Sequence, residues 1–336
     1  MDKNEVETSP RLADVAKAAG VSVATASRAL SRPDMVAAET RQRVEQAAEG
    51  LDFRHHPSAR ALITGRMGLI ALCVPTLANP FFAPIISGAQ RAAEEAGSGL
   101  LVVVTEASIE RERRTMSRLQ NQVDGFIALA TSGDSAELAA AAGPKPLVLV
   151  NRRAPGVSSV VVDTPDGAAQ LADHLCSLGH RKFAYLSGPP GSWMDPRRQR
   201  ALTDRVETAG GVVTPIGPLP LTYASGGGAA QEVVSSGATA VIAYNSVVLI
   251  GLHHALSSMG VRVPQDMSLA CVDDLGSIGL SMPQMTAVHV PAEDAGELAV
   301  EELSRLGNGG PPQELTLPVR FELGQSTAAP AATPPQ

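Results

Sequence analysis

The sequence predicts an α/β protein in which a small all-helical headpiece precedes two lobes built on parallel sheets. The first 52 residues show helical periodicity and no strand pattern. From Gly68 onward, short apolar runs alternate with amphipathic helical stretches, and this alternation starts afresh after Asp163. Apolar strands separated by helices are typical of parallel sheets that are covered on both faces. Two such series therefore predict two similar lobes.

Three helices are expected in the headpiece. The first ends at Gly20, and the hydroxyl of Ser22 is suited to cap a second helix over 23–30. A third helix follows Pro33. Because the link between the first two helices is short, they match a helix-turn-helix. The expected apolar faces of the first and third helices are Leu12, Val15, Ala16 and Ala19, and Val44, Ala47, Ala48 and Leu51.

The elements of the two lobes follow from the same alternation. Strands are expected at 68–74, 99–104, 125–130, 146–150, 183–188, 212–217, 239–244 and 267–272. Helices are expected at 82–97, 109–121, 135–142, 166–178, 197–209, 229–236 and 247–259. The C-terminal segment 328–336 has low complexity, which predicts a disordered tail.

Charge is distributed unevenly along the chain. The 336 residues have a formal net charge of −7, yet residues 10–66 hold nine basic and six acidic side chains. A basic head on an acidic body suggests that nucleic acid contacts one part of the molecule only.

The cysteines and the N-terminus predict a cytoplasmic protein. Cys73, Cys176 and Cys271 each lie in an apolar segment, and three scattered cysteines do not form a disulfide framework. No apolar run approaches the ~18 residues of a membrane span. The charged N-terminus lacks the apolar core of a secretory signal.

Several motifs together point to one family. The segments DVAKAAGVS and T-x-SRAL resemble the DNA-binding headpiece of the lactose-repressor (LacI) family of bacterial transcription regulators. The segments QVDGFIAL, SLGHRKFAYLSGP and CVDD follow in the order and spacing of that family. The resemblance implies a periplasmic-binding-protein-like core, a homodimer on palindromic operator DNA near the nucleoid, and a small-molecule effector between the lobes.

The resemblance also implies domain boundaries. They are a headpiece over 1–55, a hinge helix over 56–66, a core over 67–327 and a tail over 328–336. Within the core, the N-lobe is expected over about 67–162 and 290–318, and the C-lobe over about 163–289 and 319–327.

The second helix of the headpiece is expected to read DNA. The resemblance places Val23, Ala24 and Arg28 on base edges in the major groove. Val23 and Ala24 offer apolar contact, for instance to a thymine methyl, and Arg28 can donate two hydrogen bonds to guanine. The alternative for Arg28 is a solvated surface arginine. Short hydroxyl donors suited to phosphates are Ser22, Thr25 and Ser27.

The segment HHPSARALITGR resembles the hinge helix that joins head to core in this family. Pro57 suits the first position of a helix. The family has Pro and Asn at the positions of His55 and His56, so this chain departs from the pattern there. Leu62 matches the leucine that wedges into the minor groove and kinks the duplex, and Arg60 is a further expected DNA contact.

Matching the core residue by residue gives the candidates for effector binding. Arg198 can form two hydrogen bonds to one ligand, Asn151 and Asp273 can share hydroxyl hydrogens, and aromatic rings can cover an apolar sugar or base face. Ser246 stands where the family usually has Asp, which removes a charged acceptor. A sugar is the leading interpretation, and core packing is the alternative for Phe81 and Phe82. The candidates are Phe81, Phe82, Asn151, Trp193, Arg198, Tyr223, Asn245, Ser246 and Asp273.

Two other classes of protein are alternatives: a sugar-binding protein of a transport system and an α/β enzyme. The helical head and the missing secretory signal argue against the first. The sequence holds no nucleotide-binding or nucleophile-elbow motif, which argues against the second. The spacing of His174, Cys176 and His180 fits an amphipathic helix that ends at Gly179. Neither a metal nor a cofactor is therefore expected.

Overall fold

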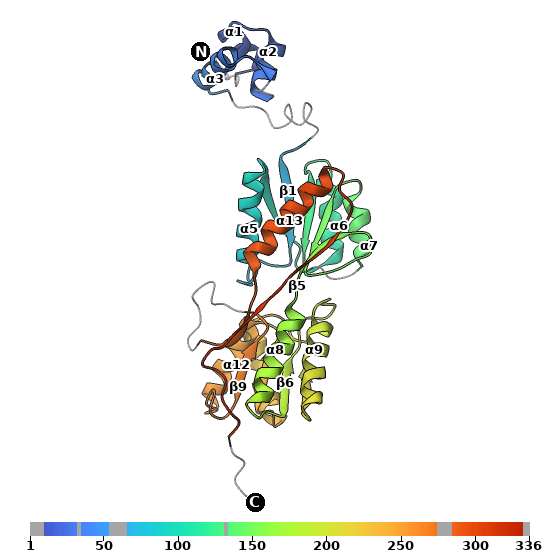
Figure 1. Ribbon diagram of the computed structural model, residues 1–336, viewed down its shortest axis with the longest axis vertical. Coiled ribbons are helices and arrows are strands. Elements are labelled where there is room, and N and C mark those ends of the chain that lie inside the picture. The colour runs from blue at the N-terminus through green and yellow to red at the C-terminus, as the bar shows by residue number, and fades with distance from the viewer. Residues whose placement is uncertain (1–9, 32–34, 54–65, 131–133, 274–283, 332–336) are drawn as a thin grey trace, which may run out of the picture. The chain divides into compact units, whose positions relative to one another are not determined.

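The chain divides into two compact units, Met1–Gly68 and Leu69–Gln336. The computed structural model describes residues 10–31, 35–53, 66–130, 134–273 and 284–331 (Figure 1). The described part of the first unit contains helices only, and the second unit contains two lobes with a sheet in each.

The headpiece packs helices α1 (Leu12–Ala18), α2 (Val23–Ser31) and α3 (Ala38–Gly50) around a small apolar core. Gly20 has a φ of 66°, which glycine adopts without strain, so the turn between α1 and α2 is tight. The Ser22 hydroxyl accepts a hydrogen bond from the Thr25 amide at 3.1 Å, which confirms the predicted cap of α2. The predicted apolar position Leu51 is wrong: it lies beyond α3 and is exposed, because Phe53 packs against the core instead.

The N-lobe has a sheet of six parallel strands within the described ranges, in the order β11-β5-β4-β3-β1-β2. Its strands are β1 (Leu69–Val74), β2 (Gly99–Val104), β3 (Gly125–Leu129), β4 (Leu147–Val150), β5 (Ser158–Val162) and β11 (Glu314–Leu317). Its helices are α5 (Phe82–Glu95), α6 (Ile109–Leu119), α7 (Ser135–Ala142) and α13 (Ala292–Gly307).

The C-lobe has a second sheet, whose described strands run in the order β12-β10-β9-β8-β6-β7, with only the β10–β12 pair antiparallel. Its strands are β6 (Lys182–Leu186), β7 (Val212–Ile216), β8 (Ala240–Ala243), β9 (Ser268–Cys271), β10 (Thr286–His289) and β12 (Arg320–Glu322). Its helices are α8 (Thr164–Ser177), α9 (Asp195–Thr208), α10 (Tyr223–Gly228), α11 (Ala230–Ser235) and α12 (Ser246–Ser258).

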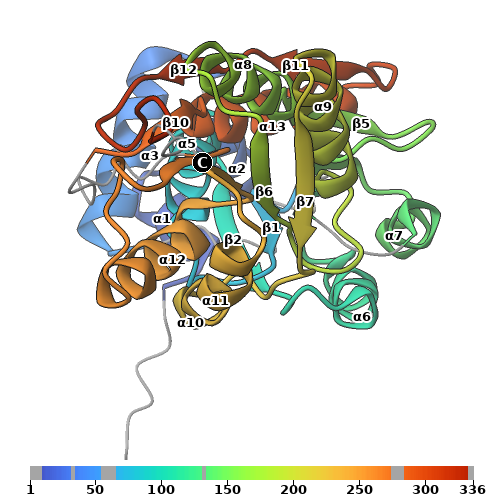
Figure 2. The ribbon, with the colours of Figure 1, turned by 90° about the horizontal axis from the view of Figure 1, so that it is seen from below.

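Helices cover both faces of each sheet, as the continuous apolar strands predict. Along β1, Leu72 packs with α5 and α13 on one face, while its neighbour Cys73 packs with α6 and α7 on the other. Along β6, Tyr185 packs with α8 and α9, and Leu186 packs with α11 and α12. Figure 2 shows this layering in the view from below.

The chain passes between the lobes three times in the described residues: from β5 to α8, from β10 to α13, and from β11 to β12. Each lobe therefore contains segments that are distant in sequence. The first sheet takes its strands from 69–162 and 314–317, and the second takes its strands from 182–289 and 320–322.

Two expectations from the sequence need correction. The single helix expected over 229–236 is the shorter α11, and a separate helix, α10, precedes it. The tail does not begin at residue 328: the Ala328 amide donates to Ser268 Oγ at 3.0 Å, and His180 Nε2 lies 2.8 Å from the Ala328 carbonyl oxygen. These contacts attach the chain through Ala328 to the C-lobe, and Ser326 Oγ adds to them by accepting from the Thr286 amide in β10 and donating to the Leu269 carbonyl oxygen in β9. Residues 332–336 lie outside the described residues.

Candidate functional site

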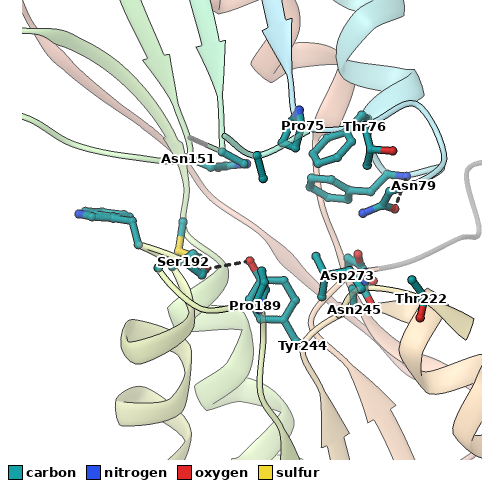
Figure 3. A pocket seen from close by; sticks show the side chains of 18 of the residues that line it. Pro75, Thr76, Asn79, Asn151, Pro189, Ser192, Thr222, Tyr244, Asn245 and Asp273 are labelled. Atoms are coloured by element: carbon teal, nitrogen blue, oxygen red, sulfur yellow. Dashed lines mark hydrogen bonds between the residues drawn. The ribbon is translucent and has the colours of Figure 1, made fainter. Parts of the chain in front are cut away.

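A cavity of about 470 Å³ lies between the two lobes. Its walls are formed by residues that directly follow strands β1, β2, β3 and β4 of the N-lobe and β6, β8 and β9 of the C-lobe. Because the carboxyl ends of parallel strands meet at one edge of a sheet, the two sheets place these loops opposite each other. Figure 3 shows Pro75, Thr76, Asn79 and Asn151 facing Tyr244, Asn245 and Asp273 across the cavity.

The N-lobe wall contains an unusual set of backbone conformations. Glu106, Ala107, Ala130 and Asn151 all have φ between 48° and 58°, the left-handed region, and all four line the cavity. Non-glycine residues pay of order 1 kcal/mol for this conformation, and such residues cluster at ligand sites. Asn151 is the residue type that tolerates it best, and its Oδ1 accepts a hydrogen bond from the Val162 amide at 3.1 Å.

Two phenylalanines form an apolar part of the same wall. The rings of Phe81 and Phe82 meet edge to face with centroids 5.6 Å apart. Phe82 is 5% exposed and belongs to the core cluster of the N-lobe, while Phe81 is partly buried against that cluster. Both also line the cavity, so the two roles considered for them from the sequence coexist.

Arg198 is a buried cation on the C-lobe wall. It is 6% exposed, and its Nε donates to Thr164 Oγ1 at 2.9 Å while its Nη1 donates to the Tyr244 carbonyl oxygen at 2.9 Å. Its guanidinium also lies 4.5 Å from the centroid of the Tyr244 ring. None of the ion pairs between described residues includes Arg198. It is therefore held rigidly beside the cavity while its charge has no carboxylate partner there.

Asn245 and Asp273 lie side by side on the same wall (Figure 3). Asn245 Oδ1 accepts from the Val248 amide at 3.0 Å and caps α12, which leaves its buried Nδ2 without a hydrogen-bond partner. Asp273 Oδ1 accepts from the Ser246 amide at 2.6 Å. A buried donor without a partner is costly unless a ligand or water accepts its hydrogens.

Two of the candidates from the sequence do not line the cavity. Tyr223 is 47% exposed on α10, with its ring 6.1 Å from that of His254. Ser246 is buried in the first turn of α12. Tyr244 supplies the aromatic ring that was assigned to Tyr223, and its hydroxyl lies 3.1 Å from Ser192 Oγ. Its position at the end of the apolar run 239–244, directly before Asn245, was the available signal. Polar or charged lining residues missed from the sequence are Thr76, Asn79, Glu106, Ser192 and Thr222.

In the headpiece, α2 exposes the side chains expected to read bases, from Val23 and Ala24 in its first turn to Arg28 in its last. Val23 is 50% exposed, and Ala24 and Arg28 are exposed as well. The exposed Val23 side chain does not belong to the headpiece core. It is therefore available to contact the methyl group of a thymine. The Ser22 and Thr25 hydroxyls lie 2.8 Å apart, and Ser27 is partly buried. The expected contacts Arg60 and Leu62, and residues 56–65 of the expected hinge, lie outside the described residues.

The histidines near Cys176 have structural partners. His180 is 1% exposed, with Nδ1 2.8 Å from Thr239 Oγ1 and Nε2 3.1 Å from Ser268 Oγ. His174 Nε2 lies 3.0 Å from Thr327 Oγ1. Burial lowers the pKa of both histidines. They attach the segment that contains Thr327 and Ala328 to the C-lobe. Among the described residues, no group of three or more His, Cys, Asp or Glu is arranged to hold a metal.

Comparisons with known proteins decide the family. Residues 11–56 match bacterial regulatory proteins of the lacI family, and residues 172–327 match a periplasmic-binding-protein-like domain. The HTH-type transcriptional regulator PtxS of Pseudomonas plecoglossicida is 31% identical over 340 residues, covering 97% of this chain and 99% of PtxS. The chain belongs to the lacI family of bacterial regulatory proteins.

Solved structures of lacI-family members agree with this assignment. The lac repressor dimer bound to operator and the anti-inducer ONPF matches with a TM-score of 0.83 and 25% identity, over 96% of this chain and 100% of that one. The CelR–cellobiose complex matches with a TM-score of 0.70 and 27% identity, over 94% and 99% of the two chains. All three of these relatives are transcription regulators and not enzymes.

Membership of the lacI family makes this chain a DNA-binding transcription regulator with an effector-binding core. A transport protein is not favoured, because the helix-turn-helix headpiece matches the lacI family directly. None of the described helices is both long and apolar enough to cross a membrane.

Proposed function

We propose that the chain represses transcription as a homodimer that reads a near-palindromic operator through α2, and that a polyhydroxylated effector binds in the cavity between its lobes. One headpiece presents a single α2 and reads one half-site, so a twofold dimer matches a palindrome. Arg28 and Val23 supply base contacts in this proposal, and Leu62 supplies the minor-groove wedge. The protein then acts in the cytoplasm, on the nucleoid.

The observation that carries the effector assignment is the unpaired, buried Nδ2 of Asn245 beside the buried Arg198. Both groups donate hydrogens, while the nearby Asp273 carboxylate accepts them. Rings of Phe81 and Tyr244 border the same space. Alternating hydroxyls over an apolar face, as in a sugar, satisfy this combination of donors, acceptor and rings. The CelR structure contains cellobiose, which supports a sugar as the leading class.

Regulation follows from differential affinity. A ligand that binds more tightly to the DNA-binding conformation acts as a corepressor, and one that binds more tightly to the other conformation acts as an inducer. The cavity is lined by both lobes, so a bound ligand contacts both and fixes their relative position.

The test is a thermal-shift screen of sugars, sugar phosphates and nucleosides, followed by operator binding with each hit. Asn245→Asp is the informative variant, because the carboxylate keeps the acceptor that caps α12 while it replaces the two donated hydrogens by a negative charge beside Asp273. We expect this variant to fold normally, to bind operator like wild type and to lose effector affinity by about 10-fold or more. Unchanged effector affinity in Asn245→Asp would refute the assignment of the cavity.

A further inference from the structure

A second cavity, of about 640 Å³, adjoins the one between the lobes. The two cavities share Trp193 and Met194 in their walls. The second one is also bordered by both lobes, with Arg153 and Thr316 from the N-lobe and Arg197 from the C-lobe. Trp193 therefore lies at the boundary through which a ligand in the first cavity can extend into the second.

Arg197 is held in an oriented position in this second cavity. Its guanidinium carbon lies 3.5 Å from the centroid of the Trp193 ring, and its Nη1 donates to the Trp193 carbonyl oxygen at 2.6 Å. Stacking on an indole covers the face of a guanidinium and leaves its other N–H groups free to donate in the plane. Such an oriented edge can bind two oxygens of one anion.

Two other arginines lie near Arg197. Burial and the nearby charges of Arg153 and Arg152 lower the pKa of Arg197. No ion pair between described residues includes Arg197. Because Arg197 is in none of these pairs, a bound anion would offset the repulsion that Arg197 experiences from the neighbouring arginines.

The two carboxylates in the wall of the second cavity have other partners. Glu314 lies 3.3 Å from Arg153 Nε, and Arg153 Nη2 also donates to Thr316 Oγ1 at 2.9 Å. Asp163 Oδ1 accepts from the Asp166 amide at the start of α8. Arg153 is thus neutralised by Glu314, whereas Arg197 is not neutralised by either acid.

We propose that Arg197 binds an anionic group, a phosphate or a carboxylate, in this second cavity, and that the effector is an anionic ligand whose neutral part occupies the first cavity. This inference rests on the proposed function for the position of the neutral part. Arg197 holds the anion through its in-plane N–H groups. The bound ligand then extends through both cavities and passes Trp193 and Met194, which line each of them.

The chain contains a single tryptophan, so tryptophan fluorescence reports on Trp193 alone, at the boundary that the two cavities share. We would titrate the full chain with inorganic phosphate, glucose, glucose 6-phosphate and gluconate at constant ionic strength. Comparing the last two separates phosphate from carboxylate, and glucose measures the neutral part alone. We expect a saturable change with at least one anion at lower concentration than with glucose. Calorimetry repeats each titration, because substitution of Arg197 itself alters the surroundings of Trp193.

Arg197→Gln should weaken binding of the anion about 10- to 100-fold, and Arg197→Lys should weaken it less, because a lysine keeps the charge but loses the planar pair of donors. Arg200→Gln is the matched control: Arg200 is exposed on the same helix and lines neither cavity, so anion binding should stay at wild-type strength. The proposal is overturned if no anion binds, or if Arg197→Gln and Arg200→Gln bind it equally. A neutral effector that still acts on Arg197→Gln would overturn this inference and leave the proposed function standing.

Discussion

Glu112 is a carboxyl group buried completely in the N-lobe, close to the end of β2. It is 0% exposed, Thr105 Oγ1 donates to its Oε1 at 3.2 Å, and its Oε2 has no hydrogen-bond partner. Burial raises the pKa of Glu112 to about 7, against the opposing effects of the Thr105 hydrogen bond and the charge of Arg152. At neutral pH the site therefore holds a carboxyl group that is only partly ionised.

This shift predicts a pH-dependent loss of stability. Because the folded-state pKa lies above the ordinary value of 4.5, the folded chain binds the proton more tightly than the unfolded chain. Stability due to Glu112 is greatest below about pH 4.5 and falls by about 3 kcal/mol as the pH rises through 7. Glu112→Gln has no titrating carboxyl group at this position. The stability advantage of this variant, which is its free energy of unfolding minus that of wild type, should therefore grow between pH 5 and pH 8.

Thermal unfolding by calorimetry at both pH values measures this advantage. Glu110→Gln is the control, because Glu110 lies at an exposed position in the same helix. Equal differences between Glu112→Gln and wild type at pH 5 and pH 8 would contradict the prediction.

Base recognition is also decided by single residues. Arg28 is exposed in the last turn of α2, the helix that the family resemblance assigns to base reading. Arg28→Ala should weaken binding to the preferred operator by about 1–3 kcal/mol and relax the preference at one base pair in each half-site. Arg43→Ala, an exposed arginine of α3, should alter affinity for all sequences alike. Selection of binding sites from a random DNA pool compares the two; identical selected sites for Arg28→Ala and wild type would show that α2 does not read the groove.

At the scale of elements, α10 and α12 pack with almost no space between their backbones. A Cβ on Gly226 would lie 1.9 Å from the Val248 carbonyl oxygen, and a Cβ on Gly251 would lie 1.9 Å from the Tyr223 carbonyl oxygen. Two residues on, a Cβ on Gly228 would meet nothing within 4 Å. This contact explains why a helix forms over a run of glycines that intrinsically disfavours it.

The two glycines of α10 should respond oppositely to substitution. Gly226→Ala forces the helices apart and should destabilise the protein by several kcal/mol, since overpacking against backbone has no cheap relief. Gly228→Ala should stabilise it by about 0.5–1 kcal/mol, because alanine favours the helix and no contact opposes it. Urea unfolding of both variants measures the difference. Equal stability of the two would mean that α10 and α12 are not in contact in solution.

At the scale of the whole molecule, a helical unit that reads DNA is joined to a two-lobed unit that binds ligand. We expect light scattering at micromolar concentration to give twice the 34.7 kDa mass of the chain. A DNA duplex with one half-site replaced should bind far more weakly than the palindrome, because one headpiece then loses its base contacts. A stable monomer both with and without DNA would contradict the dimer.

Local patterns in the sequence determined much of this architecture. Each of these patterns is local: the helical periodicity around Val15 and around Val44, the cap at Ser22, and each apolar strand depend on a few neighbouring residues. The headpiece helices and the layered lobes could therefore be predicted. Asn151, Asn245 and Asp273 were expected from the family resemblance, and the structure gives the reason for their shared location: each directly follows an apolar strand, and the carboxyl ends of parallel strands meet.

Only the tertiary structure decided features that depend on segments distant in sequence. Helix α10 forms because α12 packs closely against its glycines, which outweighs their low helix propensity. That packing leaves Tyr223 outside the cavity, and Tyr244 takes the place expected for it. Strand β11 joins the first sheet and β12 the second through partners more than 30 residues away, where no local signal exists. The proximity of Arg197 to Arg152 and Arg153 likewise depends on how the lobes bring those side chains together.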